Sequence, residues 1–130
     1  MEFQIKLFSW EDKGNHLIVL ARGIMDSAAF RRLFDEIGAV TRSLNDCKVL
    51  VDLSDATCEL KGGEIDKLVS SLSSDVWSPG SRLVFVSSLR LEDCHRLYSL
   101  RFALTTRGFC AAVFRDSKIA IDWLAGGIEA

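Results

Sequence analysis

The sequence predicts a single α/β domain built on a mostly parallel sheet. Short apolar segments of strand length alternate along the chain with longer segments whose apolar residues recur at helical spacing. The expected order is β-β-α-β-α-β-α-β-α. Strands that alternate with helices need crossover connections, which make the strands parallel. We therefore expect one domain over residues 1–130, with five strands, four helices and an antiparallel first strand at the sheet edge.

The first half of the chain predicts a hairpin followed by a helix. Residues 2–8 alternate between polar and apolar, as in a half-buried edge strand, and residues 16–22 form a strand that is apolar on both faces. A polar, glycine-containing turn joins the two strands. Asp26 or Ser27 then caps a helix whose apolar residues keep helical spacing as far as Leu44.

The second half predicts three further strands, each followed by a helix. Buried strands are expected at residues 48–53, 83–86 and 109–114. The helix after the second of these runs from about residue 91 to 107 and ends at Gly108. Four arginines of this segment do not share one face, so we expect them to be solvated: Arg90, Arg96, Arg101 and Arg107.

The candidate functional region follows the central strand. A polar turn there leads to two glycines at the start of the next helix, and binding groups gather outside the carboxyl ends of parallel strands. The candidate binding residues are Ser54, Asp55, Cys58, Glu59, Lys61, Gly62, Gly63 and Glu64. Asp52 and Asp55 could form an acidic pair, although aspartates that bond their own backbone in a turn explain them more simply.

No catalytic, metal or cofactor motif accompanies this region. The four cysteines are widely spaced, and zinc sites need close ligand pairs. Neither histidine lies beside an obvious nucleophile, and the chain has no nucleophile elbow and no phosphate-binding glycine loop. We therefore expect a protein that is not an enzyme, with no metal and no cofactor.

Individual cysteines and histidines have simple structural explanations. Cys47, Cys94 and Cys110 are expected to be small buried or half-buried residues. Cys58 lies in the central turn, where it is either another such residue or an exposed thiol. His16 begins a strand and is expected to be solvated.

Bulk composition excludes several classes of protein. A net charge of −2 and an isoelectric point near 5.7 argue against a nucleic-acid surface. The apolar runs of the chain, such as Leu17 to Ala21, are far too short to span a membrane. The N-terminal segment lacks the long apolar stretch of a signal peptide, so we expect a cytoplasmic protein.

Four short motifs carry a family resemblance. They are Gly23-Ile24-Met25-Asp26, Val49-Leu50-Val51-Asp52-Leu53-Ser54, Leu60-Lys61-Gly62-Gly63 and Gly108-Phe109. Their order and spacing, over roughly residues 3–126, resemble the STAS domain, the fold of the SpoIIAA-like anti-sigma factor antagonists. In that family the third motif reads Asp-Ser-Ser-Gly, and its first serine accepts a phosphate that switches partner binding off.

The resemblance implies a STAS-like regulatory module whose switch is altered. Lys61 stands at the position of the family's acceptor serine and Leu60 at that of the acid, while Gly63 is retained. A lysine cannot accept that phosphate, so we expect no phospho-switch in the loop from Asp55 to Gly63.

Two functions remain open at this point. The first is a module that binds a protein partner through residues 55–64 and the exposed faces of the flanking helices. The second is a small-ligand binder that holds an anion, lipid or other apolar molecule at the strand ends. Lys61 and the N–H groups of the following helix start are either an anion site or a merely solvated surface, since Glu59 and Glu64 weaken the field.

Self-association as a dimer is a further expectation. Crossovers that all run in one direction leave part of a sheet face uncovered. Since the mean hydropathy of the chain is +0.18, we expect such a patch to be apolar and to favour association. Trp10 and Trp77 are the aromatic residues expected nearest to it.

Overall fold

The computed structural model describes residues 2–10, 14–41, 47–72 and 81–126, with side chains described from residue 16 onward. These residues form an α/β fold with the elements β1 (Glu2–Trp10), β2 (Gly14–Met25), α1 (Ser27–Thr41), β3 (Lys48–Cys58), α2 (Gly62–Ser70), β4 (Arg82–Ser87), α3 (Leu91–Thr106), β5 (Cys110–Phe114) and α4 (Ser117–Leu124). The predicted alternation of parallel strands with four helices is confirmed.

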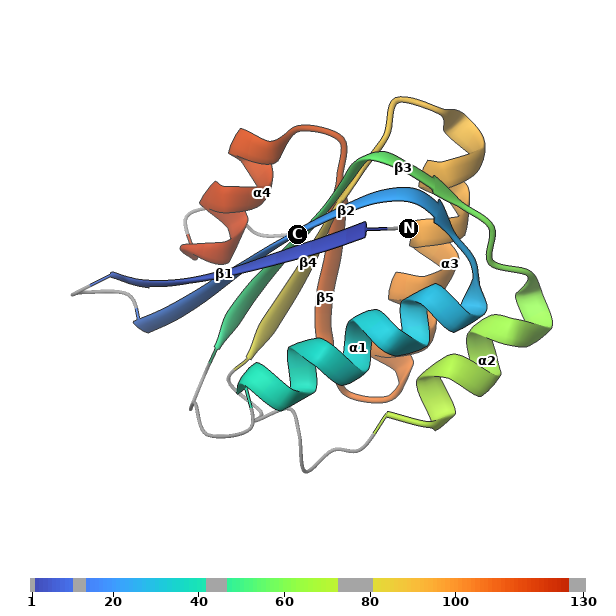
Figure 1. Ribbon diagram of the computed structural model, residues 1–130, viewed down its shortest axis with the longest axis horizontal. Coiled ribbons are helices and arrows are strands. Elements are labelled where there is room, and N and C mark those ends of the chain that lie inside the picture. The colour runs from blue at the N-terminus through green and yellow to red at the C-terminus, as the bar shows by residue number, and fades with distance from the viewer. Residues whose placement is uncertain (1, 11–13, 42–46, 73–80, 127–130) are drawn as a thin grey trace.

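The strands lie in the sheet in the order in which they occur along the chain. β1 pairs antiparallel with β2, and β2 to β5 pair parallel. Every crossover therefore moves in the same direction across the sheet, and right-handed crossovers of this kind place their helices on one face. Figure 1 shows α1, α2 and α3 on that face and α4 on the other.

The main core lies between the sheet and the three crossover helices. Strand side chains alternate between the faces, so Val49 and Val51 of β3 join this core, whereas Leu50 belongs to the cluster under α4. Phe34 of α1 is 2 % exposed and meets the ring of Phe85 of β4 edge-on, with centroids 6.4 Å apart. This ring contact helps to hold α1 against the sheet.

A smaller core lies under α4. Trp123 packs beside Phe114, and the guanidinium of Arg82 lies 5.3 Å from the centre of the Trp123 ring. Asp116 caps the helix, because its carboxylate accepts from the N–H groups of Lys118 and Ile119 at 2.8 and 3.3 Å. α4 packs on β3, β4 and β5.

Two sequence-based expectations about burial are wrong. His16 is buried rather than solvated, because β2 begins two residues earlier and places it between β1 and β3. Cys110 is exposed rather than buried, because it begins the edge strand β5. Trp77 and the side chain of Trp10, which we expected near an association surface, lie outside the described residues.

The first prediction concerns the Phe34 contact. Phe34→Ala should lower the free energy of unfolding by about 3–5 kcal/mol, because it removes a buried ring and leaves a cavity. The matched control is Phe102→Ala on α3, where the ring is 70 % exposed and the loss should stay below about 0.5 kcal/mol. Urea denaturation measures both. Equal losses in the two variants would contradict the packing of α1 on β4.

Candidate functional site

The candidate region begins as a strand rather than a loop. β3 runs to Cys58, five residues beyond its predicted end, and β2 runs to Met25. The two strands continue to pair after an irregularity near Leu20, and this pairing ends opposite Cys58. The N–H of Glu59 then donates to the Met25 carbonyl at 2.9 Å. Strand pairing thus fixes most of the segment predicted to be a turn, and only residues 59–61 connect β3 to α2.

The eight predicted binding residues do not form one cluster. Ser54 and Asp55 lie together on β3, beside a small cavity of about 30 Å³ that Asp52 also lines. Ser54 donates from its N–H and its hydroxyl to the Asp52 carboxylate, at 3.0 and 2.6 Å. Asp52 therefore bonds its local backbone, as we preferred, but it does so within β3 and not in a turn. Glu59 and Lys61 line a different and larger cavity.

Cys58 is not an exposed thiol. It is 3 % exposed, and this burial, together with the nearby Asp93 carboxylate, raises the pKa of its thiol to about 11. A hydrogen bond from the Leu60 backbone and the positive charge of Arg96 act in the opposite direction and lower the pKa by less. Its N–H donates to an Asp93 carboxyl oxygen at 2.9 Å. Cys58 therefore holds the strand end in place and offers no surface to a partner.

Asp93 is the residue that sequence reasoning missed. It lies in the first turn of α3 and is 1 % exposed, and its second carboxyl oxygen accepts from the Ser88 hydroxyl at 2.5 Å. The Ser88 hydroxyl also accepts from the N–H of Arg90 at 3.2 Å. One carboxyl group therefore joins the end of β3, the segment after β4 and the start of α3. Its only sequence signal is an acidic residue in a first helical turn, which normally indicates a surface position.

Lys61 is the N-terminal cap of α2 rather than part of its first turn. The Glu64 carboxylate accepts from the Lys61 N–H at 3.2 Å, and this bond places a negative charge at the helix start. Within the described part of the chain, the Lys61 ammonium group has no ion-pair partner. The helix N-terminus is therefore partly neutralised by the protein's own acid, while the lysine remains exposed.

A cavity of about 410 Å³ lies between the β3–α2 connection and the start of α3. Its lining comes from Thr57, Glu59, Leu60, Lys61, Arg90, Glu92 and Arg96. Arg90 caps α3 as Lys61 caps α2, so basic residues occupy both helix starts at this cavity. Arg90 donates to the Thr57 hydroxyl and pairs with Glu92, both at 3.4 Å, and Arg96 donates to the Cys58 carbonyl.

The expectation that the α3 arginines are simply solvated is wrong for two of them. Arg96 and Arg101 are half-buried, and each donates to a backbone carbonyl, that of Cys58 and that of Ala111. Their long stems cover the sides of α3 while their guanidinium groups bond the ends of neighbouring strands.

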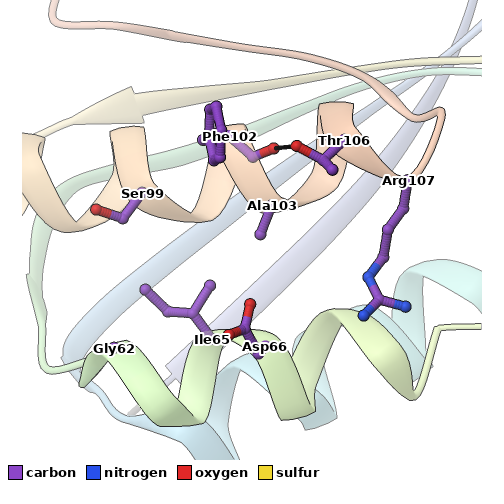
Figure 2. Close-up of a pocket in the computed structure, with 8 residues that line it drawn as sticks. All are labelled: Gly62, Ile65, Asp66, Ser99, Phe102, Ala103, Thr106 and Arg107. Carbon is purple, nitrogen blue, oxygen red and sulfur yellow. Dashed lines mark hydrogen bonds between the residues drawn. The ribbon is translucent and has the colours of Figure 1, made fainter.

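A second depression follows the seam between α2 and α3. Figure 2 shows Ser99, Phe102 and Ala103 of α3 on one side and Gly62, Ile65 and Asp66 of α2 on the other, with Arg107 beside the far end. Its volume is about 280 Å³. Since Gly62 directly follows Lys61, this groove begins where the basic cavity ends.

The geometry also bears on metal binding and on membrane insertion. Among the described residues, no three histidine, cysteine or acidic side chains gather closely enough to hold a metal ion. In the same residues, every helix is too short or too polar to cross a membrane.

The contrast between Cys58 and Cys110 gives the second prediction. In the native protein at pH 8, a thiol reagent should modify Cys110 rapidly and Cys58 much more slowly, because a thiol with a pKa of about 11 holds almost no thiolate there and is buried. Cys58 modification should accelerate only as the pH approaches 11. Peptide mapping after timed alkylation measures both, with Cys110→Ser as the control that removes the fast phase. Rapid Cys58 modification at pH 8 would contradict the burial and the raised pKa of this thiol.

The glycines at the α2 start give the third prediction. A Cβ added to Gly63 meets no atom within 4 Å, and the residue sits in the first helical turn. Gly63→Ala should therefore raise the free energy of unfolding by about 0.4–1 kcal/mol. Gly108→Ala is the matched control, because its Cβ also meets nothing but its φ is +92°, so it should destabilise by about 1–2 kcal/mol. Destabilisation by Gly63→Ala would indicate a strained backbone at the helix start.

Comparison with known proteins places the fold. No family model and no curated protein matches the sequence. Among solved structures, an uncharacterised protein from Shewanella loihica with a SpoIIAA-like fold aligns with a TM-score of 0.53 and 15% identity, over 94% of this chain and 93% of that one. The unphosphorylated form of the anti-sigma factor antagonist SpoIIAA aligns with a TM-score of 0.51 and 10% identity, over 95% and 99%. The chain therefore has a SpoIIAA-like fold.

Proposed function

We propose that this protein is a non-enzymatic, STAS-like regulatory module that binds a protein partner. The binding surface consists of the exposed part of residues 54–64, chiefly Glu59, Lys61, Gly62 and Gly63, and the adjoining exposed face of α3. Lys61 takes the place of a phospho-acceptor, so binding is not switched by phosphorylation of this loop. The module acts in the cytoplasm.

One observation carries this proposal: large apolar side chains are exposed on and just before α3, beside the candidate loop. They are Leu89, Leu91, Tyr98 and Phe102, with exposures of 78, 64, 48 and 70%. Apolar side chains gathered on one helix and edged by polar groups are typical of a protein interface. The likeness in fold to an anti-sigma factor antagonist also supports a protein partner, although at 10% identity it identifies none.

A small-ligand binder is the alternative, and the 410 Å³ cavity favours it. That volume lies within the range of ligand sites, and Lys61, Arg90 and Arg96 would attract an anion such as a phosphate or a lipid headgroup. Glu59 and Glu92 in the same lining oppose this attraction. We rank the alternative second because the carboxylates offset two of the three cations.

Dimerisation is a separate part of the proposal and uses another face. α4 packs on β3, β4 and β5, whereas its contacts with β1 and β2 are few or none. Ile18 and Leu20 of β2 are only partly buried. A second copy could cover this end of the sheet and leave the α3 face open to the partner.

The fourth prediction tests the protein-binding role. Affinity capture from cells of the source organism, quantified by mass spectrometry, should recover a partner with the parent protein and lose it with Lys61→Glu, because that change reverses the charge at the centre of the surface. Lys118→Glu on α4 makes the same charge change on the opposite side of the sheet and should retain the partner.

Two results would contradict the proposal. One is that no captured protein depends on Lys61. The other is that no protein partner depends on Lys61, while phosphate or anionic lipid raises the melting temperature of the parent protein and not that of Lys61→Glu. That result would favour the small-ligand alternative.

A further inference from the structure

α3 concentrates positive charge in a protein that is acidic overall. The chain has a net charge of −2, yet four arginines lie between Arg90, which caps α3, and Arg107, which follows its last turn. The two acids of the helix are Glu92 and Asp93, and the Asp93 carboxyl group is buried in its bonds to Cys58 and Ser88. Glu92 is therefore the one exposed acid of α3, against two arginines on the helix and one at each end of it.

The exposed face of α3 carries a stripe of three apolar side chains and one histidine. Leu91, His95, Tyr98 and Phe102 are all exposed, and they follow one another at intervals of four, three and four residues. Residues at these intervals share one side of a helix. The opposite side holds Leu97, Leu100 and Leu104 in the core. A four–three–four stripe is the spacing with which one helix packs against another.

Three of the arginines on and directly after α3 are held in position by bonds to the rest of the protein. Arg96 and Arg101 donate to the Cys58 and Ala111 carbonyls, and Arg107 donates to the Ser70 hydroxyl at 2.9 Å. Each guanidinium has five N–H donors, so one bond to the protein leaves others available for a carboxylate. A side chain that is already ordered loses less entropy on binding.

We propose that α3 is the docking surface for an acidic amphipathic helix of a protein partner. This proposal rests on the protein-binding function proposed above and specifies the chemistry of the partner. The apolar face of the incoming helix covers Tyr98 and Phe102, and its flanking glutamates or aspartates meet the arginines on either side. α3 has 16 residues and is about 24 Å long, which matches a partner helix of four to five turns.

The same features disfavour an anionic membrane and a second copy. Three apolar side chains on α3 make a small face for insertion into lipid. A second copy lacks the complementary charge on the helices it exposes. Among the described residues, acids and bases are mixed on each of the other helices: α1 exposes Arg31, Arg32, Asp35 and part of Glu36, α2 exposes Asp66, Lys67 and part of Glu64, and α4 exposes Lys118 and Asp122.

The test uses two synthetic helical peptides of about 18 residues, enough to span α3. Both carry leucines at three- and four-residue intervals, and they differ only in having glutamate or lysine at every flanking position. In fluorescence anisotropy, the glutamate peptide should bind at least about tenfold more tightly than the lysine peptide, and its affinity should fall as salt is added. Tyr98→Ser/Phe102→Ser should weaken it by about tenfold or more.

The matched control is Ile119→Ser/Ile121→Ser, which removes two exposed apolar side chains from α4 and should leave peptide affinity unchanged. Three results would overturn the proposal: equal binding of the two peptides, binding that survives Tyr98→Ser/Phe102→Ser, or no binding of the glutamate peptide. If the protein binds phosphatidylserine-containing vesicles more tightly than the glutamate peptide, the proposal is overturned in favour of a membrane. If sedimentation shows a dimer that Tyr98→Ser/Phe102→Ser abolishes and Ile119→Ser/Ile121→Ser does not, it is overturned in favour of a second copy.

Failure of this inference can be told from failure of the proposed function. If the glutamate peptide does not bind but capture of a partner still depends on Lys61, the protein-binding role stands, and the proposal that the partner docks an acidic helix on α3 is wrong. If the peptide binds at α3 but no partner depends on Lys61, the α3 surface stands and the role of the 54–64 segment is wrong.

Discussion

The arrangement of the candidate site depends on one buried carboxyl group. Asp93 accepts from the Cys58 N–H at the end of β3 and from the Ser88 hydroxyl after β4, and it belongs to the first turn of α3. A buried carboxyl group is costly unless its oxygens find donors, and here both do. Because these donors come from different parts of the chain, the strand end and the helix start cannot shift independently without leaving a buried polar group unpaired.

This constraint explains how the exposed residues are presented. The end of β3 leads directly into the connection that carries Glu59 and Lys61, and α3 begins across the 410 Å³ cavity from them. The basic helix cap of α2 and the basic, apolar face of α3 therefore form adjoining parts of one surface. In the proposed binding role the exposed surface contacts the partner and the buried network holds that surface in position, so the partner needs no direct contact with the buried residues.

The sequence was sufficient for the order of elements and insufficient for the site. Helical spacing and short apolar segments are local signals, so they predicted the four helices and the parallel strands correctly. The end of β3 depends on its pairing with β2, which no local pattern encodes, and Cys58 was therefore placed in a turn. Asp93 could not be distinguished from an ordinary acid at a helix start, because one of its two hydrogen-bond partners, Cys58, is 35 positions away in the sequence.

Amide hydrogen exchange at Cys58 tests the central claim most directly. In Asp93→Ala the Cys58 N–H loses its acceptor, so its exchange should become much faster and approach that of a locally open segment. The control is Asp116→Ala, which removes the cap of α4 and should accelerate exchange only near Lys118 and Ile119. If the Cys58 amide in Asp93→Ala exchanges as slowly as in the parent protein, the carboxyl group does not hold the strand end, and the proposed organisation of the site is wrong.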